Sequence, residues 1–338
     1  MSATKISRRA GTYALYTGAP RQLASDVVAA LAPGAPLIPA PAEHEQLLFE
    51  SEVFYHVLSS QRDFFEYPFG IQYVEPTADD VRLHVESARS LDLLLSGLLP
   101  GYMPVGPGER GELHGLCGVR ICARTERGIE LRRLGRPGRL KLTGPSRRCF
   151  AQAEARLLER VEDNGEQACW RTEGRLTDQE KRWDADRQPL VYEPIWRDAA
   201  WLPSGLLRRL GLLHTVAVPQ LVTGHENRLG EWWILELDHF ADTGLRRAEL
   251  VQALTDADHG LPLQLRGHRD WKPGESLGLV LLQDRDKTAT LQLRYDRFDY
   301  PAKGHTDRTE MFAAIRQRIS TLTGEAQLPP MPDGRATG

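Results

Sequence analysis

The sequence predicts an α+β fold in which helices and antiparallel strand pairs form two packed modules. Residues 118–143 contain short runs that alternate apolar and charged side chains between glycine-containing turns, a pattern typical of strands. Residues 146–163 and 307–322 instead carry apolar residues at helical spacing. Two more strand pairs are predicted at 213–237 and 277–298, each interrupted by a turn sequence.

The first hundred residues are expected to be mainly helical. A short strand is predicted at 12–17, followed by helices at 20–31 and 42–60 that a proline-rich segment connects. The sequence at 77–80 matches a capping box, and apolar residues recur after it at helical spacing. A long helix is therefore predicted over 78–98.

Five aromatic residues precede this predicted helix, and they are of the kind that stack on nucleic-acid bases. Phenylalanines dominate the group and few basic residues are interleaved with it, which favours a buried core under a short strand at 69–74. The group consists of Phe64, Phe65, Tyr67, Phe69 and Tyr73.

A segment rich in glycine and proline separates this helical module from the rest of the chain. Seven of the residues from Pro100 to Gly111 are Gly or Pro, which indicates a module boundary. Another capping box, Thr177 to Glu180, predicts a short helix further on. The expected division is a helical module at 1–100, a basic strand module at 101–165, a tryptophan-rich α+β module at 166–325 and a disordered tail at 326–338.

The strongest charge asymmetry lies between Arg120 and Arg148, a stretch called the basic segment below. It contains ten Lys or Arg and two Glu, so it carries +8, whereas the whole chain carries −3 and the remainder therefore −11. Nine of the ten cations are arginines, whose planar guanidinium groups suit bidentate phosphate contacts. A cationic segment in an otherwise acidic chain predicts an anionic ligand.

Alternation within the segment predicts where this ligand binds. Leu140 and Leu142 face one side of the last strand while Arg139 and Lys141 face the other, which gives the sheet one cationic face. The sequence therefore predicts binding of a phosphate-bearing ligand, above all nucleic acid, through this face and its turns. The expected contacts are Arg132, Arg133, Arg136, Arg139, Lys141, Arg147 and Arg148. An equally open alternative is a solvated face whose cations pair with acidic neighbours.

An acidic helix after the basic strands suggests a second function. Glu159, Glu162 and Asp163 can share one face of it and hold a divalent cation beside a phosphate. The order of strand, basic turn, strand and acidic helix is similar to that of Nudix hydrolases, whose helix carries an Arg-Glu and Glu-Glu box that ligates magnesium. The matching residues here, Arg156 to Gly165, lack both pairs. The resemblance implies a degenerate, Mg²⁺-dependent nucleotide hydrolase, whereas nucleic-acid binding requires no cofactor.

Three histidines lie at predicted turns with an amide or carboxylate residue two positions later. A His beside such a group can act as a general base, although the same residues are common in turns. These weaker catalytic candidates are His225, His268 and His305. The four cysteines lack the paired short spacing of a zinc site, so buried thiols are expected and no metal site is predicted.

A third hypothesis is a non-catalytic subunit of a bacterial multiprotein assembly, with the tryptophan-rich half as its interface. Frequent Ala, Gly, Pro and Arg are typical of a GC-rich bacterial genome. No run approaches the about 20 apolar residues that cross a bilayer, and no export-type apolar run follows Arg8 and Arg9. A cytoplasmic protein without membrane contact is therefore expected.

Overall fold

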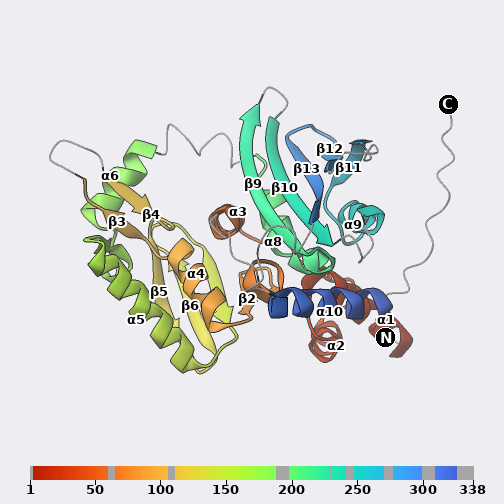
Figure 1. Cartoon of the computed structure of the whole chain (residues 1–338), viewed down its shortest axis with the longest axis horizontal. Helices are drawn as coiled ribbons and strands as arrows, with labels where there is room; N and C mark the ends of the chain where they lie inside the picture. Colours follow the sequence, from red (N-terminus) through yellow and green to blue (C-terminus); the bar gives the residue numbers. More distant parts are fainter. Residues whose placement is uncertain are drawn as a thin grey trace.

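The computed structural model describes most of the chain and has an α+β fold (Figure 1). Its described part contains two five-stranded sheets and one three-stranded sheet, with helices packed around them. None of the described helices is long and apolar enough to cross a membrane. The described residues are 3–59, 65–105, 111–187, 198–227, 230–240, 247–269, 277–298 and 309–325.

Three helices begin the chain, namely α1 (Ala3–Thr17), α2 (Arg21–Ala30) and α3 (His44–Ser59). The second and third confirm the predicted helices, whereas the strand predicted at 12–17 is wrong. Tyr13 and Tyr16 of α1 are 1% and 3% exposed. Their three-residue spacing buries both rings on one helical face, so tertiary packing overrides the strand preference of Tyr and Thr.

The first five-stranded sheet has the order β1-β2-β7-β6-β5. Its β2–β7 pair is parallel, and the other pairs are antiparallel. Helices α4 (Ala88–Leu98) and α5 (Arg147–Asp163) lie against one of its faces (Figure 1). The predicted basic strands and the helix after them are confirmed. The basic strands share this sheet with β1 and β2, which precede them in the sequence. The strands are β1 (Ile71–Pro76), β2 (Val81–Val85), β5 (Val119–Arg124), β6 (Gly128–Arg133) and β7 (Arg139–Thr143).

The helix predicted at 78–98 is wrong in its first half. Val81, Leu83 and Val85 are at most 1% exposed, and the residues between them are half-buried, so this stretch has the two-residue period of a strand. The helix begins after Ser87, whose hydroxyl caps its first turn. The four-residue spacing of the two valines fits both a helix and alternate positions of a strand.

A small sheet of order β4-β3-β8 follows α4. The capping box predicted near it is confirmed, because the Thr177 hydroxyl accepts from the Glu180 amide at 3.1 Å and the Glu180 carboxylate accepts from the Thr177 amide at 2.8 Å. The strands of this sheet are β3 (Gly101–Met103), β4 (Glu112–His114) and β8 (Gln167–Ala168). The helical elements η2 (Cys169–Arg171) and α6 (Asp178–Arg187) follow β8, and a short turn, η1 (Pro68–Gly70), precedes β1.

The second five-stranded sheet has the order β11-β12-β13-β10-β9, with β10 and β13 parallel. The predicted closing helix and the strand pair predicted at 277–298 are confirmed. The pair predicted at 213–237 is confirmed only from Val218 on, because residues 213–215 belong to helical turns before β9. The patterns predict neither these turns nor β11. The predicted tail lies outside the described residues. The elements are α8 (Trp201–Leu207), η4 (Leu210–Thr215), β9 (Val218–Asn227), β10 (Gly230–Phe240), α9 (Arg247–Leu254), β11 (Leu263–Arg269), β12 (Leu277–Asp284), β13 (Ala289–Phe298) and α10 (Thr309–Glu325).

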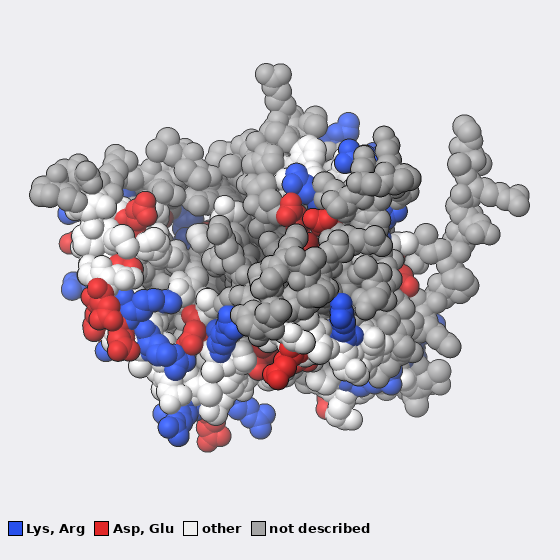
Figure 2. All heavy atoms as spheres, in the orientation of Figure 1, with Lys and Arg blue, Asp and Glu red and all other residues white. Residues whose placement is uncertain are grey.

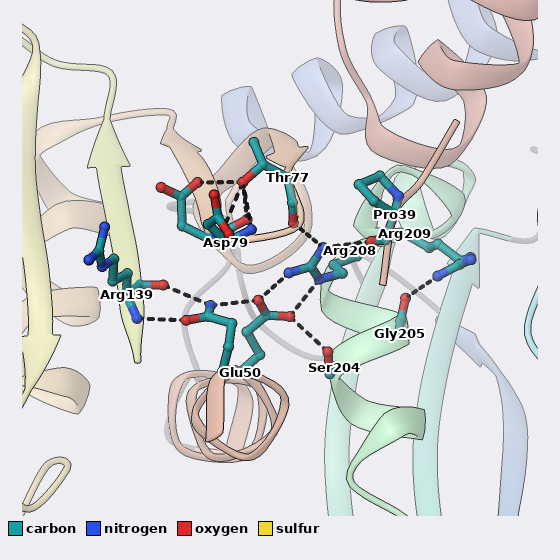
Figure 3. Close-up of polar contacts among 11 residues, drawn as sticks. Pro39, Glu50, Thr77, Asp79, Arg139, Ser204, Gly205, Arg208 and Arg209 are labelled. Atoms are coloured by element: carbon teal, nitrogen blue, oxygen red, sulfur yellow. Dashed lines mark hydrogen bonds and ion pairs between the residues drawn. The ribbon is translucent and has the colours of Figure 1, made fainter. Parts of the chain in front are cut away.

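A buried ion pair between α3 and the end of α8 joins the two halves of the chain (Figure 3). The Arg208 guanidinium donates to both carboxylate oxygens of Glu50, at 2.7 and 2.5 Å, and both side chains are at most 1% exposed. A third nitrogen donates to the carbonyls of Pro39 and Thr77 at 2.6 Å each. The Ser204 hydroxyl also donates to Glu50 at 2.7 Å. Both buried charges are therefore compensated by close partners.

Gln46, one turn before Glu50, extends this network to Arg139 of the first sheet, which Figure 3 shows beside Glu50. Its amide nitrogen donates to the Glu50 carboxylate at 2.7 Å and to the Arg139 carbonyl at 2.9 Å. Its amide oxygen accepts from the backbone N–H of Arg139 at 2.7 Å. The first residue of β7 is thereby tied to the buried ion pair through its main chain.

We predict that Glu50→Gln lowers the free energy of unfolding by about 3–5 kcal/mol, because the Arg208 charge then stays buried without its partner. Urea unfolding followed by circular dichroism measures this difference. The matched control is Asp92→Asn, which disrupts the exposed pair with Arg156 and should cost about 1 kcal/mol or less. Equal effects of the two substitutions would contradict the role given to the buried pair.

Candidate nucleic-acid interface

Strand register places most cations of the basic strands on the face of the first sheet opposite α4 and α5, called the outer face below. Leu140 and Leu142 are fully buried, whereas Arg139 is exposed and Lys141 is half-buried, as the alternation predicts. Paired residues on neighbouring strands point to the same side of a sheet. The register therefore extends the outer face across the strands in three rows.

The first row consists of arginines paired across β7, β6 and β5, namely Arg139, Arg132 and Arg120. Arg120 is buried and donates to both carboxylate oxygens of Glu180, at 2.6 and 2.9 Å. Arg132 is half exposed and pairs with Glu130 at 2.8 Å. The guanidinium of Arg139 is exposed and contacts no carboxylate of the described residues. Of the three, only Arg139 can bind an anion without leaving an acidic partner.

Glu180 explains why Arg120 is unavailable to a ligand. Its carboxylate also accepts hydrogen bonds from the backbone N–H groups of Gly118, at 2.9 Å, and Thr177, at 2.8 Å. Burial alone would raise the pKa of Glu180, but the hydrogen bonds from Arg120 and these amides outweigh burial and hold the pKa below its usual value of 4.5. Arg120 therefore anchors the start of α6 against the sheet.

The second row carries two acidic and two basic residues and is balanced in charge. It contains Glu75, Arg82, Lys141 and Glu130, paired across β1, β2, β7 and β6. Arg82 donates to Glu75 at 3.1 Å, and Lys141 pairs with Asp80 beside the row. In this part of the outer face the cations pair with acidic neighbours, as the alternative reading of the basic segment expects.

The third row is uncharged and partly aromatic. It contains Tyr73, His84, Thr143 and Gly128. The rings of Tyr73 and His84 stack, with their centroids 4.3 Å apart and their planes inclined by 12°. The Nδ1 atom of His84 lies 3.2 Å from the hydroxyl oxygen of Thr143. The outer face therefore holds an ordered aromatic pair that the sequence does not predict.

This pair divides the aromatic group predicted to form a core. Phe65 and Phe69 are 6% and 5% exposed, which confirms the core prediction for these two phenylalanines. Tyr73 lies half-buried on the outer face and packs against the core, so the core prediction holds only in part for this residue, and Phe64 lies outside the described residues. His84, which stacks on Tyr73, could be placed on the outer face from the sequence only if residues 81–85 were predicted as a strand.

Five arginines of the basic segment contact no carboxylate of the described residues. Arg136 and Arg139 lie at the end of the outer face where β7 begins, in and just after the β6–β7 turn. Arg127, Arg147 and Arg148 lie at the other end, in the β5–β6 turn and the first turn of α5. Arg136 is half-buried and the other four are exposed. The five residues of β7 separate the two groups by about 13 Å.

Arg133, one of the predicted contacts, faces the opposite side of the sheet. Its guanidinium donates to Glu52 of α3 at 2.7 Å, and its side chain is 12% exposed. This ion pair faces away from any ligand on the outer face. The structure therefore does not bring Arg133 together with the other predicted contacts.

The acidic residues predicted to hold magnesium lie on α5, away from the outer face. Glu159 and Asp163 line a surface hollow of about 380 Å³ that also contains Asp92 and Arg156, which pair at 2.7 Å, while Glu162 is exposed nearby. Figure 2 shows positive and negative side chains interleaved over the part of the molecule that contains α5. Within the described residues, no three His, Cys, Asp or Glu side chains are grouped so that they could hold a metal ion.

The histidine and cysteine candidates do not form a site in the described part of the chain. His268 is exposed on β11, whereas the side chain of His225 and the whole of His305 lie outside the described residues. The cysteines are free thiols, and the expected burial holds only for Cys169, since Cys122 is exposed and the other two are half-buried.

The described tryptophans are buried or half-buried. Trp170 and Trp233 are 5% and 0% exposed, and the others in the described ranges are half-buried. The large hydrophobic side chains exposed in these ranges are Val105 and Leu265, which lie far apart in the sequence. No described tryptophan therefore supplies an exposed anchor for a partner protein.

Comparison with known proteins finds no relative of this chain: no family model, curated protein or solved structure matches it. A function can therefore be inferred only from the residues themselves. The outer face carries Arg139 and the Tyr73–His84 pair, and the other four arginines without a described carboxylate partner lie in the turns at its two ends and in the first turn of α5.

We predict that Glu180→Gln destabilises the protein at neutral pH and that this effect shrinks in acid. The folded-state pKa of Glu180 lies below its unfolded value, so its contribution is fully present above about pH 4.5 and is lost as the pH falls through the folded pKa. Urea unfolding of both proteins between about pH 7 and pH 3 gives this difference. Glu130→Gln, at the exposed pair with Arg132, is the control with an expected effect of about 1 kcal/mol or less. A difference that stays constant down to pH 3 would contradict the assignment.

Proposed function

We propose that the protein binds nucleic acid through the outer face and the turns at its two ends. The observation that supports this most directly is the set of five arginines in the basic segment that keep no acidic partner among the described residues. Neighbouring cations on the same sheet do pair with Glu or Asp. Acidic partners are thus available locally, and these five guanidinium groups still lack them.

The start of α5 supports phosphate binding at one end of the outer face. This helix has no side-chain cap at Ser146 and no acidic residue in its first turn, where Arg147 and Arg148 lie instead. A helix N-terminus already carries a partial positive charge and free N–H groups. Two arginines at this place add to that positive potential, which a phosphate would neutralise.

The predicted contacts divide into two groups under this proposal. Arg136, Arg139, Arg147 and Arg148 bind phosphate directly, together with Arg127, which the initial prediction omits. Arg132 and Lys141 are 49% and 34% exposed in their side chains, but each must first leave an acidic partner. They contribute less, because part of any gain from a phosphate is lost with the existing ion pair.

We predict that the affinity for an oligonucleotide falls steeply with salt, with a log–log slope of about −3 to −4 for four or five phosphate contacts. Arg139→Glu should weaken binding about tenfold and reduce this slope by about 1. Fluorescence anisotropy titrations of a labelled oligonucleotide at several salt concentrations measure both quantities.

The matched control is Arg160→Glu, which makes the same change of charge at the hollow on α5. It should leave affinity and salt slope nearly unchanged, because this residue lies away from the outer face. Equal weakening by both substitutions would point to overall charge and against the proposed site. Binding that does not depend on salt would exclude the phosphate contacts altogether.

A further inference from the structure

We propose that the outer face selects single-stranded nucleic acid, and that an unpaired base stacks on the Tyr73–His84 pair. This inference rests on the proposed function and adds the class of nucleic acid and the residues that select it. Arginines alone bind the phosphates of single strands and duplexes alike. The uncharged third row of the outer face supplies the additional chemistry.

The two rings are held in a fixed orientation before any ligand binds. Tyr73 and His84 stack at 4.3 Å, and the imidazole Nδ1 lies 3.2 Å from the hydroxyl oxygen of Thr143. Both side chains are half-buried, so each is supported by the sheet and keeps part of its surface open. Rings that are already ordered lose little conformational entropy when a base stacks on them.

The protonation state of His84 also suits stacking. Burial lowers the pKa of this imidazole, with Glu75 opposing and Arg82 assisting the shift, so the ring is neutral near pH 7. A neutral aromatic pair gives a base an uncharged surface beside the charge-balanced second row. Stacking on such a surface is tolerant of sequence, because every base has an aromatic face.

The neighbourhood of the pair differs between its two sides. Across the strands from His84, the row continues with the small residues Thr143 and Gly128. On the opposite side, the buried Tyr13 of α1 is close enough to Tyr73 to interact with it electrostatically. Gly128 is buried and Thr143 is half-buried, so a base approaches the pair over His84 and Thr143.

Cations lie where the phosphates next to this base would be. Burial and then Glu75 raise the pKa of Tyr73, whereas Arg82 and Arg127 lower it, so Arg127 acts on this ring alongside an acidic neighbour. Arg147 and Arg148 follow Thr143 of the same row by a short turn. A base on the pair thus has arginines at the same end of the sheet. A duplex keeps its bases paired and stacked inside, so it cannot offer one to the aromatic pair without the cost of unpairing.

The test compares labelled single strands of about 12 nucleotides, as DNA and as RNA, with duplexes of the same sequence. The full-length protein should bind the single strands more tightly, and Tyr73→Leu should weaken that binding about tenfold while leaving duplex binding unchanged. Leucine keeps an apolar side chain but removes the ring. Tyr102→Leu, at a half-buried tyrosine of the small sheet, is the matched control and should change neither.

Two results would separate this inference from the proposed function. Equal affinity for single strands and duplexes, with Tyr73→Leu inert but Arg139→Glu weakening both, would overturn the stacking inference and leave nucleic-acid binding intact. The absence of salt-dependent binding to any of these oligonucleotides would overturn both.

Photochemical crosslinking tests the contact without any substitution. A single strand that carries iodouracil is irradiated with the unmodified protein, and the adduct is located by mass spectrometry. A crosslink at Tyr73 or His84 supports the inference. Crosslinks confined to residues outside the outer face would overturn it.

Discussion

The buried pair of Glu50 and Arg208 is the interaction on which the arrangement of the two larger sheets depends. Its members are 158 residues apart in the sequence. Burying either charge without the other would cost several kcal/mol. Arg208 also donates to the carbonyls of Pro39 and Thr77, so the same side chain fixes the proline-rich segment and the β1–β2 turn. Any other docking of α8 on α3 would leave a buried charge and two carbonyls without partners.

Gln46 carries this constraint to the outer face. It binds both main-chain groups of Arg139, so the start of β7 is positioned by its backbone while the guanidinium stays free. Arg120 shows the opposite arrangement, since Glu180 and several carbonyls use up its donors. Two arginines of one row thus have different roles, and the difference arises from their partners and not from their own chemistry.

Short-range sequence patterns predict the helices and strands that depend on neighbouring residues. The strands β5 to β7 and helix α5 follow from alternation, turns and helical spacing, and the uncovered face of β7 follows from Arg139 and Lys141 alone. The partners of the cations are not local: Glu180 lies 60 residues from Arg120, and Glu52 lies 81 residues from Arg133. No short-range pattern distinguishes these buried cations from exposed ones. The Tyr73–His84 pair could not be predicted from the sequence for another reason, because the apolar spacing of residues 81–85 also fits a helix.

The distribution of paired and unpaired cations favours an extended ligand over a compact one. The middle row of the outer face is electrically balanced by Glu75, Glu130 and Asp80, so the positive potential is confined to two ends about 13 Å apart. A single phosphate or free nucleotide can reach one end only. A strand that reaches both makes its second contact at the high effective concentration set by the first. The rest of the chain carries −11 and so repels polyanions. Under the proposed function, contact at both ends would therefore make a nucleic-acid strand a better ligand for the face than its separate nucleotides.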